Sequence, residues 1–244
     1  MARYLSVDEI IRRAALEIGL LPPANPASDS DDAFVQMRGL LDSSGQELCE
    51  LNDWPVLIKS YSITTSSTDT GSYTLPSDFN YMIDQTGWDR NRRLPLGGPI
   101  SAQEWTYLKG RNLTNQLIYA SFRELDGNFD IFPSPPPDGL EISFEYVSRN
   151  WLREENQTQA TLDVINNGTD VCILDPLLSI KFLKLKFLQA KGFDYAAAAM
   201  EFDTLLSGRI GKSTGAQILS ASNGNYGMRY ITPYGNTTDT GYGI

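Results

Sequence analysis

Three features of the chain contain residue types whose spacing could support chemistry. The first is Gly208–Thr214, where Gly-Lys-Ser matches the end of a phosphate-binding loop. That loop also needs a glycine at position 206, where this chain has Leu206, and a preceding strand, whereas this segment follows a helical pattern. We therefore interpret Gly208 as the C-cap of that helix and expect no nucleotide site.

The second feature, Asp126–Asp130, imitates the first half of a calcium-binding EF-hand loop. Such a loop needs a glycine at its sixth position and a bidentate glutamate at its twelfth, where this chain has Ile131 and Pro137. Because Asp-Gly between two apolar runs is a strong hairpin signal, we predict a turn joining strands at 117–122 and 128–132.

The third feature is a set of carboxylate pairs, Glu124 with Asp130 and Glu154 with Glu155. Two carboxylates that flank a glycosidic bond can hydrolyse it, at a separation that sets the stereochemistry. Nothing in the sequence fixes that separation. A carboxylate-dependent glycoside hydrolase therefore remains only as a less favoured alternative.

The composition narrows the function further, because the 244 residues include no histidine. Ser-His-Asp and Cys-His catalytic sites and imidazole metal ligands are thereby excluded. Thirty acidic against twenty basic residues give a net charge of −10, which disfavours binding to DNA phosphates. We expect no catalytic residue, no cofactor and no bound metal.

Cysteine use and hydropathy indicate the compartment. Cys49 and Cys172 lack metal-ligand spacing and are interpreted as buried, reduced thiols. The first residues contain no hydrophobic run typical of a secretory signal. The longest apolar stretch, Leu177–Leu188, is interrupted by three lysines. We expect no membrane anchor, and synthesis in a reducing cytoplasm.

The first zone of the chain, residues 1–55, predicts two helices. Ser6 and Glu9 form a capping box that opens the first helix, and Asp29, Asp31 and Asp32 suit the positive end of the second. Apolar residues then recur at spacings of three and four, a helix seam with Ser44 and Gly45 as a small-residue break. The seam comprises Phe34, Met37, Leu41, Leu48 and Leu51.

The second zone, residues 56–174, predicts antiparallel strands. Residues 58–63 and 141–147 alternate polar and apolar types, and Ser101–Glu104 is a second capping box that starts a short helix near 101–109. Near Asp175-Pro176 the helical pattern resumes through residue 207. The fold class is therefore α+β. A helical bundle from both chain ends (1–55 plus 175–207) holds an inserted antiparallel β-sandwich or barrel-like domain (56–174).

The last 37 residues, 208–244, carry glycines, tyrosines and only four charges, with a net of +2. Tyrosine and arginine at wide spacing are typical of contact residues, so we interpret 208–244 as an extended C-terminal arm that orders against a partner. The alternative is a disordered tail. The candidate contact residues are Arg209, Lys212, Tyr226, Arg229, Tyr230, Tyr234 and Tyr242.

A family resemblance rests on the order of several short motifs. These are Asp53-Trp54-Pro55, Tyr73-Thr74-Leu75-Pro76-Ser77-Asp78-Phe79, Phe132-Pro133-Ser134-Pro135, Gly139-Leu140-Glu141-Ile142 with Tyr146, and Asp175-Pro176-Leu177-Leu178. Over about residues 5–207 this order resembles the head-to-tail adaptor (connector) proteins of tailed bacteriophages, similar to the tail tubular protein A type. Residues 208–244 do not match by motif, so their assignment to portal contact rests on their position and composition.

The resemblance implies a non-enzymatic virion structural protein at the head–tail junction, used during genome ejection. It implies a ring of twelve copies beneath the portal protein, with the helical bundle and C-terminal segments toward the portal. The β domain would face the tail nozzle or the next tail component, and DNA would pass through without specific binding. A net negative channel suits that passage, since like charges do not adhere.

The charge distribution suggests one contact within such a ring. Residues 1–55 carry ten acids and four bases, whereas Lys181, Lys184 and Lys191 form a basic stripe on a later helix. We hypothesise that the two meet, within a subunit or as a subunit interface. The alternative is a solvated lysine face.

A second alternative function keeps the β domain at its centre. Trp88 and Trp105 lie near expected element ends and could form the platform of a carbohydrate- or receptor-binding β module. Such a module predicts saturable glycan binding, whereas the adaptor predicts association with itself and with the portal.

Overall fold

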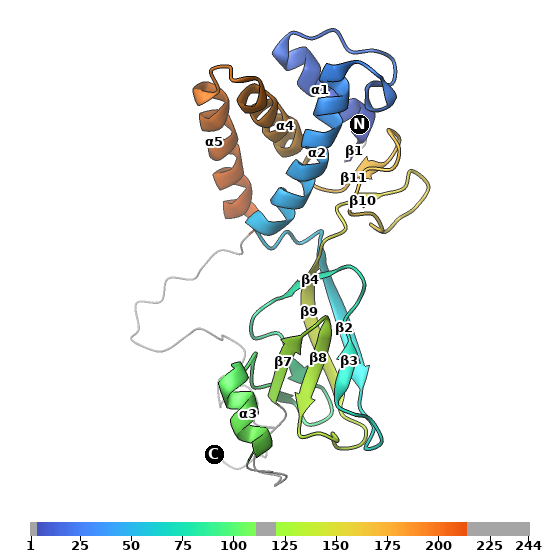
Figure 1. The fold of residues 1–244 in the computed structure, drawn as a ribbon, viewed down its shortest axis with the longest axis vertical. Helices are drawn as coiled ribbons and strands as arrows, with labels where there is room; N and C mark the ends of the chain where they lie inside the picture. Colours follow the sequence, from blue (N-terminus) through green and yellow to red (C-terminus); the bar gives the residue numbers. More distant parts are fainter. Residues whose placement is uncertain (1–3, 111–120, 214–244) are drawn as a thin grey trace, which may run out of the picture. The chain divides into compact units, whose positions relative to one another are not determined.

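The computed structural model describes residues 4–110 and 121–213. Four long helices come from the two chain ends, and the described strands after β1 (Leu5–Ser6), together with one short α-helix, lie between them in sequence (Figure 1). The long helices are α1 (Val7–Ile18), α2 (Asp32–Leu51), α4 (Pro176–Lys191) and α5 (Ala196–Ser213). This is the expected α+β class.

Helix α4 is the centre of the bundle and contacts α1, α2 and α5 (Figure 1). Its sequence is apolar around most of its circumference, which is typical of a helix enclosed by others. The aromatic rings of Phe182 on α4 and Phe202 on α5 stack with their centroids 4.4 Å apart. The core side chains of α4 are Leu178, Ile180, Phe182, Leu183, Leu185 and Phe187.

Hydrogen bonds cap the helices, and they confirm the predicted helix starts at Ser6, at the aspartates before α2 and near Asp175. The Ser6 hydroxyl accepts from the Glu9 amide, the Asp31 carboxylate from the Ala33 amide, and the Asp175 carboxylate from the Leu178 amide. Each bond satisfies an amide that has no partner within its own helix. Gly19 and Gly192 end their helices with φ values of 87° and 72°, which glycine adopts without strain.

The end of α5 corrects one prediction. The helix continues through Gly208 to Ser213, so Gly208 is not a C-cap and residues 208–213 are helical rather than part of an extended arm. The apolar spacing set by Phe202 continues through Leu206 and Ile210, which pack against the bundle core. That burial outweighs the cost of about 1 kcal/mol for each helix-interior glycine.

Two sheets between residues 58 and 148 form a sandwich. The larger contains β2 (Ile58–Thr64), β9 (Glu141–Ser148), β5 (Trp88–Asp89) and β6 (Leu94–Pro95) in that order, and β4 (Phe79–Met82) also pairs with β9. The smaller contains β3 (Ser72–Thr74), β8 (Asn128–Phe132) and β7 (Ser121–Leu125). The short helix α3 (Ala102–Gly110) carries the predicted capping box between Ser101 and Glu104.

An aromatic core joins the two sheets. The Phe129 ring from β8 stacks on Phe144 from β9 at 5.0 Å between centroids and on Phe122 from β7 at 4.8 Å. All three side chains are buried. Because alternate strand residues point to opposite faces, Phe144 points inward while its neighbour Glu145 faces solvent, as the alternation predicted.

The predicted hairpin is confirmed between β7 and β8. Asp126 and Gly127 have φ values of 52° and 70°, and positive values at both central residues are typical of the tight turns that match strand twist. The first strand differs from the expected 117–122, because it runs to Leu125, opposite Asn128. Residues 117–120 of that prediction lie outside the described residues.

A third sheet ties the start of the chain to the end of the insertion. β1 (Leu5–Ser6) and β10 (Leu152–Arg153) both pair with β11 (Val171–Cys172), in antiparallel orientation. Cys172 on β11 and Cys49 on α2 are free and buried, as predicted. Burial raises the pKa of the Cys49 thiol to about 12 and that of Cys172 to about 11, so both stay protonated and unreactive.

Candidate assembly surfaces

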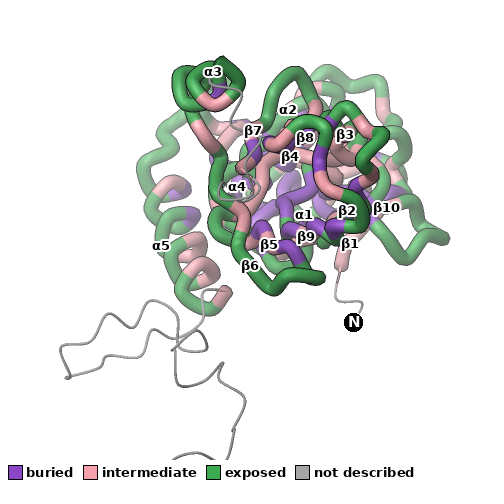
Figure 2. Tube along the Cα trace, turned by 90° about the horizontal axis from the view of Figure 1, so that it is seen from below, coloured by how far each residue is buried: buried purple, intermediate pink, exposed green. Residues whose placement is uncertain are grey.

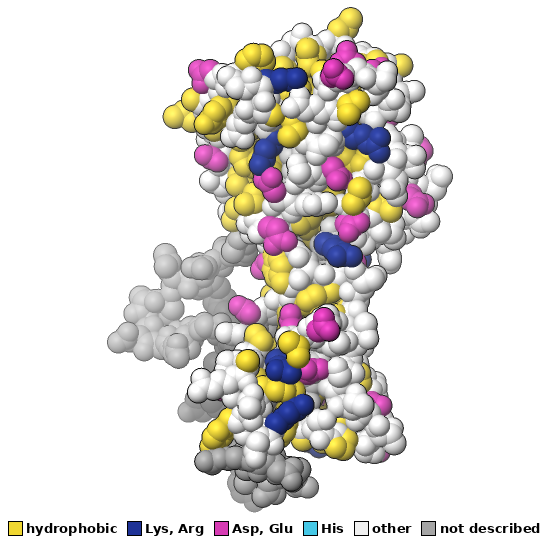
Figure 3. Space-filling view, viewed as in Figure 1, with side chains coloured by type: hydrophobic (Ala, Val, Ile, Leu, Met, Phe, Trp, Pro, Cys, Tyr) yellow, Lys and Arg dark blue, Asp and Glu magenta, His cyan; other side chains and the backbone are white. Residues whose placement is uncertain are grey.

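An outward-facing groove runs between α4 and α5. It is an open groove with a volume of about 780 Å³, and its apolar lining includes the residues Leu177 and Met200, which are 43% and 73% exposed. Small residues of α5 widen it, namely Ala197, Thr204 and Gly208. Figure 2 shows that α5 keeps one exposed (green) side along its length, and Figure 3 shows hydrophobic and basic side chains together on the helical bundle.

The charged side chains of the groove are mainly basic. Lys181, Arg209 and Lys212 line it together with a single carboxylate, Glu201. Arg209 bridges to Asp175 at 3.1 Å between Nη2 and Oδ2, which ties the end of α5 to the start of α4. Arg209 and Lys212 were expected on the extended arm, and the structure places both on α5.

The predicted basic stripe of α4 meets carboxylates of the same chain. Lys181 Nζ lies 2.9 Å from Glu17 Oε2 of α1 and 3.2 Å from Glu201 Oε2 of α5. Lys184 Nζ lies 3.3 Å and 3.6 Å from the same two oxygen atoms. Hydrogen bonding to Glu17 raises the pKa of Lys181, and hydrogen bonding to Lys181 lowers the pKa of Glu201. Lys191 instead lies 5.5 Å from the Phe187 ring centroid.

Removing both lysine charges is expected to lower the melting temperature by a few degrees. A Lys181→Gln/Lys184→Gln variant would leave Glu17 and Glu201 facing each other without cations. Because the side chains are 19–50% exposed, solvent and salt screen the network, so the effect is modest and shrinks at high salt. Thermal unfolding at low and high ionic strength measures it. The control is Lys191→Gln, and equal melting temperatures for the two variants would contradict the role of the network.

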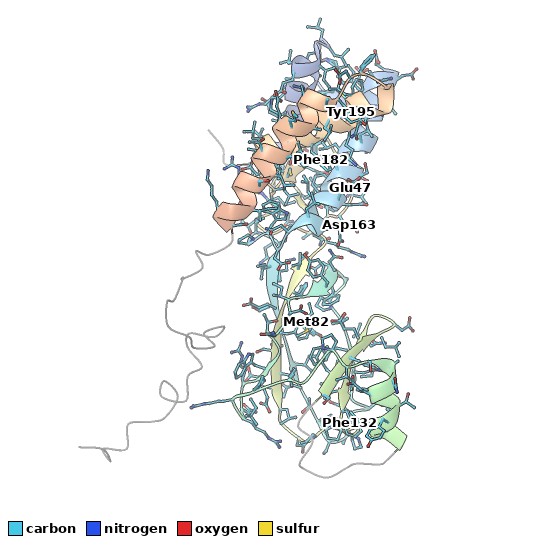
Figure 4. All side chains as sticks on the ribbon, turned by 90° about the vertical axis from the view of Figure 1, so that its left-hand side faces the viewer. Glu47, Met82, Phe132, Asp163, Phe182 and Tyr195 are labelled. Atoms are coloured by element: carbon cyan, nitrogen blue, oxygen red, sulfur yellow. The ribbon has the colours of Figure 1, made fainter. Side chains whose placement is uncertain are left out.

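A second exposed surface of the bundle is the outer face of α2. Gly39 lies within this 20-residue helix, and a Cβ built there meets nothing within 4 Å. Exposed neighbours at helical spacing are Asp32, Val35, Ser43 and Glu50. Glu47, labelled in Figure 4, lies on the flank of α2 toward α4 and accepts a 2.8 Å hydrogen bond from Lys186. No contact within the described residues explains a glycine at position 39.

A polar junction connects α2 with the sheets. The Asn80 amide donates to Glu50 Oε1 at 2.8 Å, and the Tyr81 hydroxyl donates to Asp53 Oδ1 at 2.8 Å. Both donors lie on β4 and both acceptors lie at or just beyond the end of α2. These bonds hold the end of the helix against the edge strand.

Asp78, immediately before β4, is the most connected side chain of this region. Its carboxylate accepts hydrogen bonds from Lys59 Nζ at 2.6 Å, Ser148 Oγ at 2.7 Å and Tyr146 OH at 3.0 Å. Burial raises its pKa, but the three donors and the Lys59 charge outweigh burial and hold the pKa below its usual value. One carboxylate therefore links β2, β9 and the start of β4.

The carboxylates considered for hydrolysis do not form a catalytic pair. In the β7–β8 register Asp130 lies opposite Arg123, to which it pairs at 3.4 Å, whereas Glu124 lies opposite Phe129. Glu124 and Asp130 therefore point to opposite faces of the sheet. Glu154 and Glu155 are exposed neighbours in a turn. Within residues 4–110 and 121–213, no three Cys, Asp or Glu side chains are arranged to hold a metal ion.

The expected aromatic platform is also corrected, because Trp105 is 4% exposed. Its ring packs beneath the Arg123 guanidinium, 4.5 Å from the centroid, and edge-on against Phe132. A sugar stacks on an exposed ring face, so Trp105 does not serve such a platform with Trp88. Tyr226, Arg229, Tyr230, Tyr234 and Tyr242 lie outside the described residues.

Comparison with models of protein families shows to which family the chain belongs. The family model described as SU10 adaptor protein matches residues 5–226. The chain belongs to the SU10 adaptor protein family. No curated protein matches the chain. The expected class, a structural adaptor of a phage particle, is thereby confirmed, and the match extends beyond the residues that carried the sequence resemblance.

Two of the surfaces were not foreseen from the sequence. The groove of the adaptor forms only because α5 continues past Gly208. The exposed face of α2 can be identified only after its buried residues have been assigned. The sequence signal that could have indicated these surfaces is the glycines at positions 39, 208 and 211. A glycine inside a helix lowers its stability, so its presence there indicates that a small residue is needed at that position. No helix within the described part of the adaptor has the length and apolarity that a membrane span requires.

Proposed function

We propose that the adaptor assembles as a ring, of twelve copies as in the tail tubular protein A type, at the junction between the portal and the tail. The observation that carries this proposal is the family match over residues 5–226. The ring would line the channel through which DNA leaves the head. The tail nozzle or next tail component would contact the β-sandwich.

The charge of the adaptor supports this role. With a net charge of −10 the chain repels the DNA phosphates rather than binding them, which suits a passage that must not retain the genome. A ring subunit also needs two different faces that complement each other. The bundle offers two different surfaces, the open apolar groove on α4 and α5 and the exposed face of α2.

The C-terminal residues are proposed as the portal contact. Arg209 and Lys212 lie on the last turns of α5, immediately before the segment that carries Tyr226, Arg229, Tyr230, Tyr234 and Tyr242. Tyrosine and arginine contribute strongly to protein interfaces because they combine apolar area with directional hydrogen bonding. This proposal rests on composition and on position in the chain.

Light scattering of the purified adaptor, alone and mixed with its cognate portal protein, tests the function. We expect a species of about twelve times the 27.1 kDa subunit mass, joined stoichiometrically to the portal. A chain truncated after Ser213 keeps all four long helices and is expected to lose portal binding. Adaptor that associates neither with itself nor with the portal under any condition would contradict the role.

A further inference from the structure

The outer edge of β2 is open. β2 is an edge strand of the larger sheet, and within the described residues it pairs only with β9. At the two ends of this ladder the Ser148 amide donates to the Leu57 carbonyl and the Thr65 amide donates to the Leu140 carbonyl. Because ladder bonds occur at every second residue, the odd-numbered residues of β2 bond β9. The even-numbered residues direct their N–H and C=O groups away from it.

This edge lacks the features that keep strand edges from pairing. The register with β9 is continuous along β2, which contains no proline, and its one charged residue, Lys59, forms an ion pair with Asp78. The other side of the same sheet is protected. There β6 is two residues long and contains Pro95, and the register of β4 shifts between Phe79 and Tyr81. Short strands, prolines and bulges are ways of blocking an edge, so only the β2 side is left able to accept a strand.

The side chains beside the open edge are small and uncharged. Tyr61 faces Phe144 across the ladder and packs against its ring, so the neighbouring residues of β2 point to the outer face of the sheet. These are Ser60, Ser62 and Thr64, which are all exposed. Small side chains let the backbone of another strand approach, and its N–H and C=O groups supply the hydrogen bonds of β-strand addition.

A second copy of β2 fits this edge because the outward residues are symmetric about Tyr61. In an antiparallel pair centred there, Ser60 lies opposite Ser62 of the second copy, and Ile58 lies opposite Thr64. Every outward N–H and C=O group then has a partner, hydroxyl meets hydroxyl, and no charge faces a like charge. Since the chain carries a net charge of −10, an uncharged strip is also where two copies repel each other least.

The space beside the start of β2 accommodates the far end of such a strand. A hollow of about 490 Å³ is lined by residues that include Ile58, Ser60, Thr158 and Ala160. In the symmetric pair, Thr64 of the second copy lies beside Ile58 and so at this hollow. The same fit is repeated at the other end of the pair.

We propose that the free adaptor forms a two-fold dimer in which β2 pairs antiparallel with β2 of a second copy. Neighbours in a cyclic ring are related by the rotation of the ring and not by a two-fold axis. The pairing therefore belongs to the protein before assembly, where it covers an edge that would otherwise recruit other strands, and it opens before a ring forms. It goes beyond the proposed ring and does not depend on it.

A proline on the open edge tests the pairing. Ser62→Pro removes an N–H that points away from β9, so no ladder bond within the subunit is lost, and edge strands tolerate proline. We expect the unmodified adaptor to sediment at twice the 27.1 kDa subunit mass and Ser62→Pro to sediment as a monomer. The matched control is Ser62→Ala, which keeps the N–H and is expected to remain dimeric. Circular dichroism verifies the fold of each variant.

Disulfide trapping tests the register. Residues 60 and 62 of opposite copies form a hydrogen-bonded pair with a Cα separation of about 5.5 Å, which suits a disulfide. A mixture of Ser60→Cys and Ser62→Cys is therefore expected to give a cross-linked dimer on mild oxidation. Each variant alone places its cysteine opposite a serine and is expected to stay uncross-linked. The native Cys49 and Cys172 are buried and do not compete.

The outcomes separate the dimer from the adaptor role. Free adaptor without a dimer, a Ser62→Pro variant that stays dimeric, or equal cross-linking of the single and mixed cysteine variants would each overturn the pairing. Portal binding is measured independently of these results. A monomeric Ser62→Pro variant that still joins the portal would support the pairing and keep the adaptor role, whereas a dimeric adaptor that never binds the portal would overturn that role alone.

Discussion

Alanine at position 45 is expected to lower the free energy of unfolding by about 1–3 kcal/mol. Gly45 lies in the middle of α2, and a Cβ there would come within 2.3 Å of the Trp151 indole ring. Trp151 is completely buried, and its Nε1 donates to the Asp163 carbonyl at 2.9 Å, so the ring cannot move aside without breaking that bond. Chemical denaturation monitored by circular dichroism measures the loss.

The same helix supplies the matched control. Gly39→Ala makes the identical chemical change where a Cβ meets nothing within 4 Å, and is expected to raise stability by about 0.5–1 kcal/mol through helix propensity. Because both variants gain the same propensity, their difference isolates the clash with Trp151. Equal stability of the two variants would refute the close packing at Gly45.

Removal of the Asp78 charge is expected to cost about 2–4 kcal/mol at neutral pH. In Asp78→Asn the side chain keeps its shape but loses the ion pair with Lys59 and presents an amide donor to groups that themselves donate, Tyr146 and Ser148. The carboxylate is only 13% exposed, so water replaces these bonds poorly. Denaturation at pH 7 measures the difference from the unmodified chain.

The Asp78 effect should depend on pH with a defined sign. The pKa of Asp78 is lowered in the folded state, so folding favours the charged form. This contribution is fully present above the usual aspartate pKa of about 3.9 and is lost as the pH falls through the lower folded value. The unmodified chain therefore approaches the stability of Asp78→Asn only in strong acid.

A second aspartate distinguishes the Asp78 network from a general charge effect. Asp126→Asn changes an exposed residue of the β7–β8 turn, where asparagine tolerates the same positive φ. It is expected to leave stability unchanged within about 0.5 kcal/mol. A similar loss in both variants, or a difference at Asp78 that persists unchanged below pH 3, would argue against the network.

Local signals in the sequence predicted the elements that depend on local interactions. Ser6, Asp31 and Asp175 cap helices where their side chains can reach amides two or three residues away, so the pattern and the contact lie in the same few residues. The Asp126-Gly127 turn is equally local. Alternation also predicted β9, because its inner residues face one continuous core.

Elements held by distant contacts were not predictable in this way. β1 is two residues long and exists because Leu5 and Ser6 pair with Cys172 and Val171, far along the chain. Gly45 was interpreted as a break in a helix seam, whereas the structure shows it accommodating Trp151, about one hundred positions later. The extension of α5 past Gly208 likewise depends on packing against the bundle core.

The candidate assembly surfaces were predicted only in part. The basic residues of α4 were identified, but their pairing with Glu17 and Glu201 depends on how α1 and α5 pack around α4. A docking surface is made of the residues that remain exposed after the core has formed. Its residues follow from the sequence only after the buried residues are assigned.

The helices of the bundle come from the two ends of the chain, and this affects the order in which the parts fold during synthesis. Helices α1 and α2 need α4 to cover their apolar faces, yet α4 begins 125 residues after α2 ends. At about 5–20 residues per second, the nascent helices wait about 6–25 s for that partner. The strands between Ile58 and Ser148 pair only with one another, so the sandwich can complete its hydrogen bonding during that interval. We therefore expect the inserted sheets to fold on the ribosome before the helices that precede them.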